Sequence, residues 1–183
     1  VNALLNISRI ESGRLIIAPK STNLENLINS LVTELKQDLT KKDLSLEIKF
    51  DANTPTISID PDLITQAYLN LLTNSIKYTP TGGHIYITVS QTDKEIISEI
   101  SDSGIGIPEK DQSRIFEKFF RTDKSVKVST DGNGLGLYLV KAVVESSGGR
   151  IWFKSEENKG TSFFFTLPLE GSPAQVGEVT LNR

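Results

Sequence analysis

The 183-residue sequence contains no cysteine, no methionine and a single histidine, His84. Without cysteine the chain cannot carry a disulfide scaffold, a thiolate metal site or a cysteine nucleophile, and one histidine cannot build a multi-histidine metal centre. No uninterrupted apolar run approaches the roughly 18 residues needed to span a bilayer, so we expect no membrane contact from this chain. Because it begins at Val1 and lacks methionine, we expect it to be a piece of a longer protein.

An excess of basic residues is also lacking, because 20 lysines and arginines face 23 aspartates and glutamates, for a net charge of -3. A mildly acidic chain lacks the positive charge that neutralises phosphates, which excludes a general nucleic-acid binder. The hydrophobic fraction of 37% and the charged fraction of 23% are ordinary for a folded domain and argue against wholesale disorder. The length suits one well-buried domain with a short appendage.

Three helices are predicted from apolar side chains that recur at helical spacing. The first follows Pro19, and the third covers Leu135–Ser147 and is closed by Gly148–Gly149. The second begins at Asp60–Pro61, since aspartate is a favoured N-cap and proline a favoured first helical residue, and it ends near Lys77–Tyr78. The apolar stripe of the first helix consists of Leu24, Leu27, Ile28, Leu31, Val32 and Leu35.

Strands are predicted where apolar side chains alternate between turns rich in glycine, proline or polar residues. The segments are 44–50, 56–59, 84–89, 96–101, 150–154 and 162–167, of which the last two form a predicted hairpin. Helices mixed with antiparallel hairpins indicate an α+β fold. We expect a two-layer sandwich over residues 21–169, with a mixed, mostly antiparallel sheet of about five strands packed against three helices, and a flexible tail over residues 170–183.

Residues 102–134 show little periodicity, and a compact domain rarely keeps so long an irregular segment unless it is a functional loop or lid. Glycine clusters bracket it, at 102–107 and at 132–137, and the second cluster opens a helix. Backbone amides at a helix N-terminus can hold a phosphate, although ordinary turn glycines would also explain either cluster alone. The second cluster has G-x-G-x-G spacing, not that of a dinucleotide fingerprint, and Lys159-Gly160-Thr161 runs in the wrong order for a Walker A motif.

Polar side chains gather on one face of the second predicted helix. Asn70, Asn74 and Lys77 are spaced to share that face, and Tyr78 lies four residues after Asn74. Asparagine is a poor helix former, so two aligned asparagines need a reason, of which a solvated polar face is the simplest. The alternative is a ligand site, because an amide oxygen can bind Mg²⁺ beside phosphate oxygens, while Lys77 neutralises phosphate and Tyr78 covers a base.

The motifs follow one another in a fixed order: Asn70-Leu-Leu-Thr-Asn74-Ser-Ile-Lys77-Tyr78-Thr, Asp102-x-Gly-x-Gly-Ile, Ile115-Phe-Glu-Lys-Phe-Phe-Arg121, Gly132-x-Gly-Leu-Gly-Leu and Gly160-Thr161. Together they resemble the nucleotide-binding boxes of the catalytic, ATP-binding domain of sensor histidine kinases, a branch of the Bergerat-fold ATPases. The resemblance covers about residues 22–169 and is specific because five spaced motifs agree.

The resemblance implies ATP and Mg²⁺ as cofactors and gives the residues of the helix catalytic roles. Asn74 would coordinate Mg²⁺, Asn70 and Lys77 would lie near the phosphates, and Tyr78 would lie against the adenine. Asp102 would accept a hydrogen bond from the exocyclic amine of adenine, which selects ATP over GTP because guanine has an oxo group there.

The resemblance also implies roles for the loop segments. Gly104, Gly106 and Ile107 would let the base approach, and Thr161 would close the pocket. An aromatic box would anchor a mobile lid that extends to Gly132. The box consists of Phe116, Phe119 and Phe120. Arg121 and Lys124 would reach the phosphates or the partner helix, unless they are solvated lid charges. The residues that would present amides to the phosphates are Gly132, Gly134, Leu135, Gly136 and Leu137.

Asn70 distinguishes between the activities known for this fold. In related hydrolases, such as the gyrase ATPase subunit, a glutamate stands at this position and activates water, which an amide cannot do at neutral pH. We therefore expect phosphoryl transfer from ATP to a histidine. The alternatives are a non-catalytic nucleotide-sensing module and an ATP-hydrolysing clamp of the gyrase type.

The phosphate-accepting histidine expected of such a kinase is missing from this chain. His84 follows Gly82-Gly83 at the start of a predicted strand, inside the catalytic domain, whereas the acceptor would lie on a dimerisation helix. Residues 1–20 resemble the end of the second dimerisation helix and its linker, so the acceptor would lie upstream of Val1. The implied partners are those upstream helices and a response regulator that meets the full-length kinase, itself a homodimer. The implied location is the cytoplasm, and membrane anchoring of the parent stays open.

Overall fold

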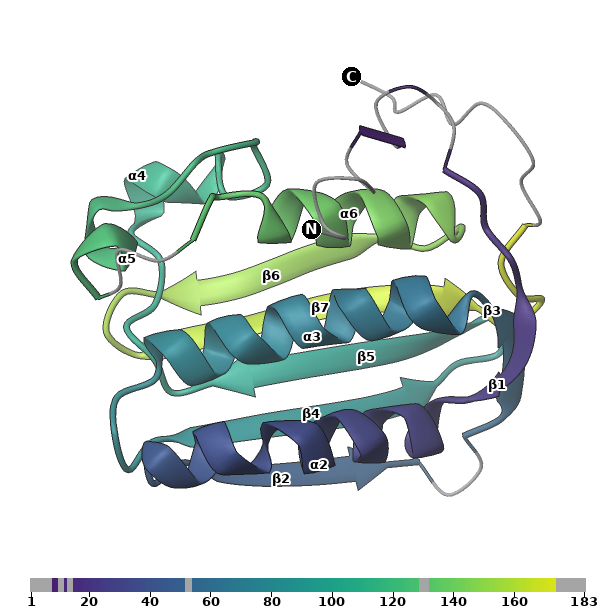
Figure 1. Cartoon of the computed structure of the whole chain (residues 1–183), viewed down its shortest axis with the longest axis horizontal. Helices are drawn as coiled ribbons and strands as arrows, with labels where there is room; N and C mark the ends of the chain where they lie inside the picture. The colour runs from purple at the N-terminus through teal and green to yellow at the C-terminus, as the bar shows by residue number, and fades with distance from the viewer. Residues whose placement is uncertain (1–7, 10–11, 13–14, 52–53, 129–131, 174–183) are drawn as a thin grey trace.

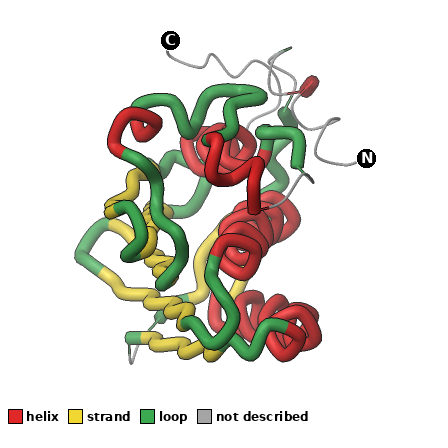
Figure 2. Tube along the Cα trace, turned by 90° about the vertical axis from the view of Figure 1, so that its left-hand side faces the viewer, coloured by secondary structure: helices red, strands yellow, loops and turns green. Residues whose placement is uncertain are grey.

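The computed structural model describes residues 8–9, 12, 15–51, 54–128 and 132–173. It has two layers, a five-stranded sheet and three long helices that pack on the same face of that sheet (Figure 1). The side view shows the long helices on one side and the strands on the other (Figure 2). The predicted α+β sandwich with a mixed, mostly antiparallel sheet is confirmed.

The helices are α2 (Leu24–Lys41), α3 (Pro61–Tyr78) and α6 (Gly136–Ser146). The strands, in spatial order, are β2 (Ser45–Phe50), β4 (His84–Gln91), β5 (Glu95–Asp102), β7 (Gly160–Pro168) and β6 (Ile151–Glu156).

The strand order places the ends of distant segments side by side. β2 pairs in parallel with β4, and the chain crosses between them through α3, as parallel neighbours require. The remaining pairs are antiparallel: β4 with β5, β5 with β7 and β7 with β6. As a result, Asp102 at the end of β5 lies opposite Thr161 near the start of β7.

A second, two-stranded sheet joins β1 (Lys20–Asn23) to β3 (Thr56–Ile59) in antiparallel register. The predicted strand at 56–59 is confirmed, but it lies outside the main sheet. Its partner β1 is not predicted by the sequence, because the segment Lys-Ser-Thr-Asn has no apolar alternation and is largely exposed.

Helix α3 begins where the sequence predicts, after Asp60. One carboxylate oxygen of Asp60 accepts hydrogen bonds from the amides of Asp62 and Leu63, each at 3.1 Å. The other oxygen accepts one from the amide of Ala18 at 2.8 Å. Asp60 therefore caps α3 and also fixes the segment that precedes β1. The buried face of α3 consists of Leu63, Ile64, Ala67, Tyr68, Leu71, Leu72, Ser75 and Ile76.

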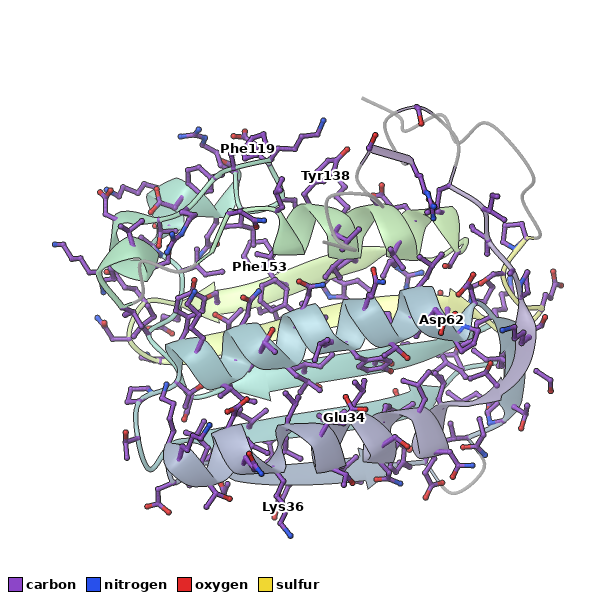
Figure 3. All side chains as sticks on the ribbon, in the orientation of Figure 1. Glu34, Lys36, Asp62, Phe119, Tyr138 and Phe153 are labelled. Carbon is purple, nitrogen blue, oxygen red and sulfur yellow. The ribbon has the colours of Figure 1, made fainter. Side chains whose placement is uncertain are left out.

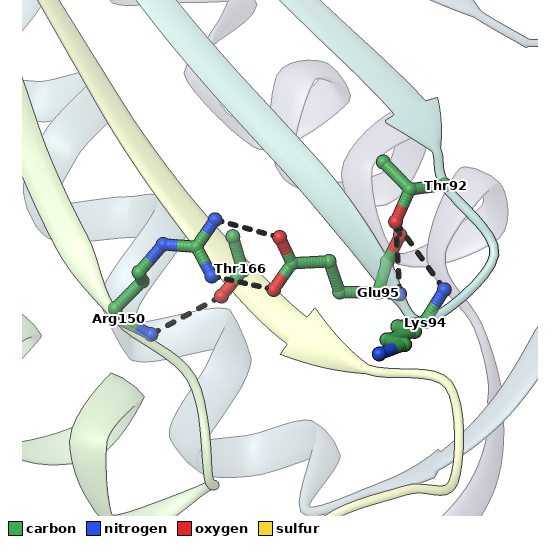
Figure 4. Close-up of polar contacts among 5 residues, drawn as sticks. All are labelled: Thr92, Lys94, Glu95, Arg150 and Thr166. Atoms are coloured by element: carbon green, nitrogen blue, oxygen red, sulfur yellow. Dashed lines mark hydrogen bonds and ion pairs between the residues drawn. The ribbon is translucent and has the colours of Figure 1, made fainter.

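The sheet has one buried face and one solvated face. Ile85 and Ile87 alternate with exposed residues along β4 and are buried against the helices, the pattern of an antiparallel sheet covered on one side. On the solvated face, Arg150 forms a two-pronged ion pair with Glu95, with both N–O distances 2.7 Å, beside Thr166 of β7 (Figure 4). Hydrogen bonds from the Arg150 guanidinium hold the pKa of Glu95 below its ordinary value.

An aromatic pair on β6 and β7 is covered by cations. The rings of Trp152 and Phe164 stack with centroids 5.3 Å apart and planes at 7°. The Arg150 guanidinium lies 5.2 Å from the Trp152 ring centroid, and the Lys154 ammonium lies 5.6 Å from that of Phe164. These cation–π contacts cover apolar rings that the helix layer does not reach.

The long connection from β5 to α6 is mostly irregular, as predicted, but contains two short helices, α4 (Glu109–Gln112) and α5 (Asp123–Val128). After β7 the packing continues past residue 169, since Ser172 is buried and its amide donates to the carbonyl of Ser58 at 2.7 Å. The rest of the predicted tail and most of residues 1–14 lie outside the described residues. In the part of the chain that the structure describes, no helix is both long and apolar enough to cross a membrane.

Replacing Asp60 by alanine should lower the free energy of unfolding by about 1–2 kcal/mol, because the variant loses the cap of α3 and the bond to Ala18. Asp62→Ala is the matched control, because Asp62 lies in the same first turn but is exposed (Figure 3). Its loss should cost only the charge–dipole interaction, about 0.3–1 kcal/mol. Urea unfolding followed by the fluorescence of Trp152 measures both, and equal losses would contradict the capping role.

Candidate functional site

A cavity of about 270 Å³ opens at the end of the sandwich where α3 ends and α6 begins. Four segments line it: the C-terminal half of α3, the loop after β5, the connection to α6, and the start of β7. Of the residues predicted to contact the nucleotide, all except Gly104 and Lys124 border this cavity. They are Asn70, Asn74, Lys77, Tyr78, Asp102, Gly106, Ile107, Phe120, Arg121, Gly132, Gly134, Leu135, Gly136, Leu137 and Thr161.

The α3 side of the cavity carries neutral amides. The side-chain nitrogen of Asn70 donates to the carbonyl of Gln66 at 2.8 Å, and Oδ1 faces α6, where a Cβ on Gly136 would come within 2.9 Å of it. Asn74 is half-buried, and no hydrogen bond joins its side chain to another residue that the structure describes. The wall therefore offers amide groups to a ligand where a hydrolase would need a carboxylate.

A positive charge stands between α3 and the glycine-rich loop. The ammonium of Lys77 lies 5.5 Å from the ring centroid of Tyr78, within cation–π range. A Cβ on Gly132 would come within 3.3 Å of the same ammonium. Lys77 thus reaches from the helix to the opposite rim of the cavity, where it can meet an anion.

The carboxylate of Asp102 is held by donors from three segments. Oδ2 accepts a hydrogen bond from the hydroxyl of Ser75 at 3.1 Å, and Oδ1 accepts from the amides of Gly104 at 2.9 Å and Thr161 at 3.3 Å. Gly104 is buried behind this carboxylate, and a Cβ there would lie 2.6 Å from Oδ1 and 2.9 Å from the carbonyl oxygen of Tyr78. Gly104 therefore supports the site from behind and does not line it.

Burial raises the pKa of Asp102 above its ordinary value, and the hydrogen bonds from Gly104, Ser75 and Thr161 oppose that shift. A carboxylate in such a wall has lost part of its hydration, so it gains most from a ligand that supplies a further donor. This corner of the cavity therefore favours a ligand with an N–H group over one with an oxo group.

The loop after β5 packs tightly on the turn between β6 and β7. A Cβ on Gly106, whose φ is 63°, would lie within 2.1 Å of the carbonyl oxygen of Glu156, so only glycine fits there. The amide of Ile107 donates to the hydroxyl of Ser155 at 2.9 Å, and that hydroxyl bonds to the hydroxyl of Thr161 at 2.8 Å. The predicted residues Ile107 and Thr161 are thus linked through Ser155, and Gly106 packs against the neighbouring Glu156.

The three rings of the predicted aromatic box differ in where they lie. Phe116 packs edge-to-face on Phe153 and Phe163, with ring centroids 6.0 and 6.5 Å away, and this contact anchors the connection to the core. Phe120 lines the cavity and also packs against the hydrophobic core. Phe119 is 71% exposed, has a φ of 62°, and lies on the outer surface (Figure 3). Two of the three rings therefore anchor the connection, and the third does not.

The charged residues of this connection also differ from one another. Arg121 lines the cavity, and its guanidinium donates to the carbonyl of Gly132 at 3.0 Å. Lys124 is directed away from the cavity, because its ammonium binds Glu157 at 2.5 Å and Asn158 at 2.9 Å in the β6–β7 turn. The expectation that Lys124 reaches a phosphate is not met here, since that turn holds its charge.

Six lining residues are not predicted by the sequence: Ile105, Ile115, Thr122, Ser125, Asn133 and Phe163. Ile105 and Asn133 stand inside the two glycine motifs, so the motifs themselves could have indicated them. Ile115 and Phe163 are buried apolar residues that no pattern separates from the core. Thr122 and Ser125 enter only because the connection folds back over the cavity.

A two-layer sandwich with a glycine-framed cavity beside a helix that carries two asparagines has the architecture expected of the Bergerat-fold ATPases. The chain belongs to the family described as histidine kinase-, DNA gyrase B-, and HSP90-like ATPases, whose model matches residues 59–171. The resemblance to histidine kinase catalytic domains is confirmed by the proteins that the chain is similar to.

The sensor histidine kinase WalK of Bacillus subtilis is 35% identical over 176 residues, which are 93% of this chain and 28% of WalK. The catalytic domain of histidine kinase ThkA superposes with a TM-score of 0.72 at 27% identity, over 85% of this chain and 99% of that domain. Full-length ShkA in complex with AMPPNP has a TM-score of 0.80 at 26% identity, over 95% of this chain and 36% of ShkA. This chain spans less than half the length of the curated relatives it matches.

Asp102→Asn should preserve the fold, because an amide oxygen can still accept from Gly104 and Thr161 while its nitrogen donates to the hydroxyl of Ser75. Since burial raises the pKa of Asp102, the folded parent binds a proton more tightly than the unfolded chain. Its stability therefore falls as the pH rises from the ordinary aspartate pKa to the raised one. The variant has no carboxyl group at this position and does not lose stability in this way. The unfolding free energy of the variant minus that of the parent should therefore increase between these two pKa values. Urea unfolding of both proteins at acidic and neutral pH tests this, and a difference that does not change with pH would refute it.

Proposed function

We propose that this chain is the ATP-binding catalytic domain of a sensor histidine kinase, and that it transfers the γ-phosphoryl group of ATP to a histidine on a dimerisation helix outside the chain. One observation supports this above all: Asn74, Asp102 and Gly134 border a single cavity although they come from three distant segments. AMPPNP, an ATP analogue, accompanies ShkA, a protein of the same fold.

In the proposed complex the two ends of the cavity bind the two ends of ATP. The carboxylate of Asp102 accepts a hydrogen bond from the adenine amine, and Tyr78 and Ile107 contact the base. The phosphates lie between Lys77 and the amides that precede and open α6. The N-terminus of α6 suits them because its amides lack intrahelical partners and carry partial positive charge.

Mg²⁺ fits the same end. Asn74 would hold the ion, because its side-chain amide is half-buried at the cavity. Within the described residues, no side chain or backbone group forms a hydrogen bond with this amide. When bound, the ion neutralises charge on the phosphates. The chain's own residues orient the nucleotide and stabilise charge, with Lys77 and the α6 amides placed around the transferred group.

Asn70 favours transfer over hydrolysis. Its nitrogen is committed to the carbonyl of Gln66, and an amide is no base for activating water at neutral pH. His84 does not serve as the acceptor in this proposal. It is exposed on β4, its Nδ1 lies 2.6 Å from the hydroxyl of Ser45, and it is not among the cavity residues.

The proposal extends to the partners expected of the full-length kinase. These are its own dimerisation helices, through which it forms a homodimer, and a response regulator that receives the phosphoryl group. The proposed location is the cytoplasm, where ATP is available.

Binding of nucleotides tests the first half of the proposal. The parent chain should bind Mg-ATP more tightly than Mg-ITP, whose ring carries an oxo group in place of the adenine amine. Asp102→Asn should weaken the binding of ATP by about tenfold or more, because the side-chain amide and the adenine amine are both donors and then face each other. The ratio of the ATP affinity to the ITP affinity should also fall. Calorimetric titration measures the affinities of both nucleotides. Glu99→Gln, on the solvated face of β5, is the control and should bind as the parent does. An unchanged ATP affinity in Asp102→Asn would count against the assignment.

Phosphoryl transfer tests the second half. Alone, the chain should form no phosphohistidine, but with Mg-ATP and the dimerisation helices of its own full-length protein it should phosphorylate them. Asn74→Ala should abolish transfer in the same assay. Bound ATP without any transfer would favour a nucleotide-sensing module, whereas rapid ATP turnover without the helices would favour a clamp of the gyrase type.

A further inference from the structure

The C-terminal end of α3 is held by a lysine from another element. Lys42 follows the last residue of α2, and its ammonium donates to the carbonyls of Ile76 at 2.7 Å, Lys77 at 3.0 Å and Thr79 at 2.6 Å. An ammonium has three N–H donors, so all three are used. None of these partners is a carboxylate, and burial lowers the pKa of Lys42.

These bonds complete the hydrogen bonding of a helix end that would otherwise be incomplete. The last carbonyls of a helix have no partner within it. In α3 the carbonyl of Ser75 accepts from the amide of Thr79 at 3.0 Å, and that of Tyr78 accepts from the amide of Ile105 at 3.2 Å. The two carbonyls between them, those of Ile76 and Lys77, are bonded by the Lys42 ammonium. The positive charge also stands at the negative end of the helix dipole.

Lys42 also fixes the turn that follows α3. Its own carbonyl accepts a hydrogen bond from the amide of Gly82 at 3.1 Å, while its ammonium holds Thr79 on the other side of the turn. The residue after it, Asp43, has a φ of 50°, which lets the chain leave α2 sharply and enter β2. The lysine is thus part of a rigid corner between α2, α3 and β4.

We infer that Lys42 is a positioning residue of the nucleotide site, acting through the backbone of α3 to hold the Lys77 side chain toward the phosphates of the nucleotide. The inference rests on the proposed function, because it assigns Lys77 a phosphate contact. The peptide groups on both sides of Lys77 are those that Lys42 bonds. The carbonyl of Tyr78 keeps its separate bond from Ile105, so the side of the site that contacts the base does not depend on Lys42 in the same way.

Lys42→Met tests this, because methionine keeps much of the apolar stem but has no charge and no donor. We expect the dissociation constant for Mg-ATP to rise about tenfold or more, while that for adenosine, which has no phosphate, changes much less. The matched control is Lys41→Met, one residue earlier, whose exposed ammonium binds Asp38 at 3.2 Å. That variant should bind both ligands as the parent does.

The ratio of the two affinities separates positioning from general destabilisation. A variant that is merely less folded should lose affinity for Mg-ATP and for adenosine by the same factor, and this result would overturn the inference. An unchanged affinity for Mg-ATP would overturn it as well. Trp152 fluorescence shows whether Lys42→Met is folded. If it is not, Lys42→Gln takes its place: its two N–H donors cannot bond all three carbonyls, so it must show a smaller loss that is again selective for Mg-ATP. A parent chain that binds neither ligand would instead overturn the proposed function.

Discussion

Helix α3 is held by one charged side chain at each end, and the site depends on that constraint. At its start Asp60 bonds both the first turn and the amide of Ala18, and at its end Lys42 bonds three carbonyls. Between these points the helix buries an apolar face on the sheet. The side of its C-terminal half that faces the cavity can then carry two asparagines, although asparagine weakens a helix. Stability from packing and caps offsets that cost.

Asp102 is a residue whose position costs stability. A partly buried carboxylate with a raised pKa is less stable there than an uncharged group would be. The fold nonetheless supplies it with donors from Ser75, Gly104 and Thr161, which fix its direction. A residue that costs stability yet is carefully oriented is typical of a group kept for a ligand.

The sequence predicts much of the fold because its patterns are local. The cap at Asp60, the stripe of α2 and the alternation in β4 each follow from neighbouring residues. Strand β1 has no such pattern, and its pairing with β3 follows from how distant segments pack. The same limit holds at the site. The motifs indicate Asn74 and Asp102, but nothing local indicates that Lys124 turns away to Glu157 or that Lys42 reaches α3 across 34 residues.

The tie between Lys124 and the β6–β7 turn is sensitive to dissolved salt. The same turn packs against Gly106 on one side and holds α5 through Glu157 on the other, so the cavity wall at Gly106 and helix α5 share one support. The side chains of this ion pair are 36% and 45% exposed, and exposed charges are screened by dissolved ions. The strength of the tie between α5 and this turn therefore depends on the ionic strength of the surrounding solution, whereas the Asp102 carboxylate, held by hydrogen bonds from uncharged donors, is largely insensitive to it.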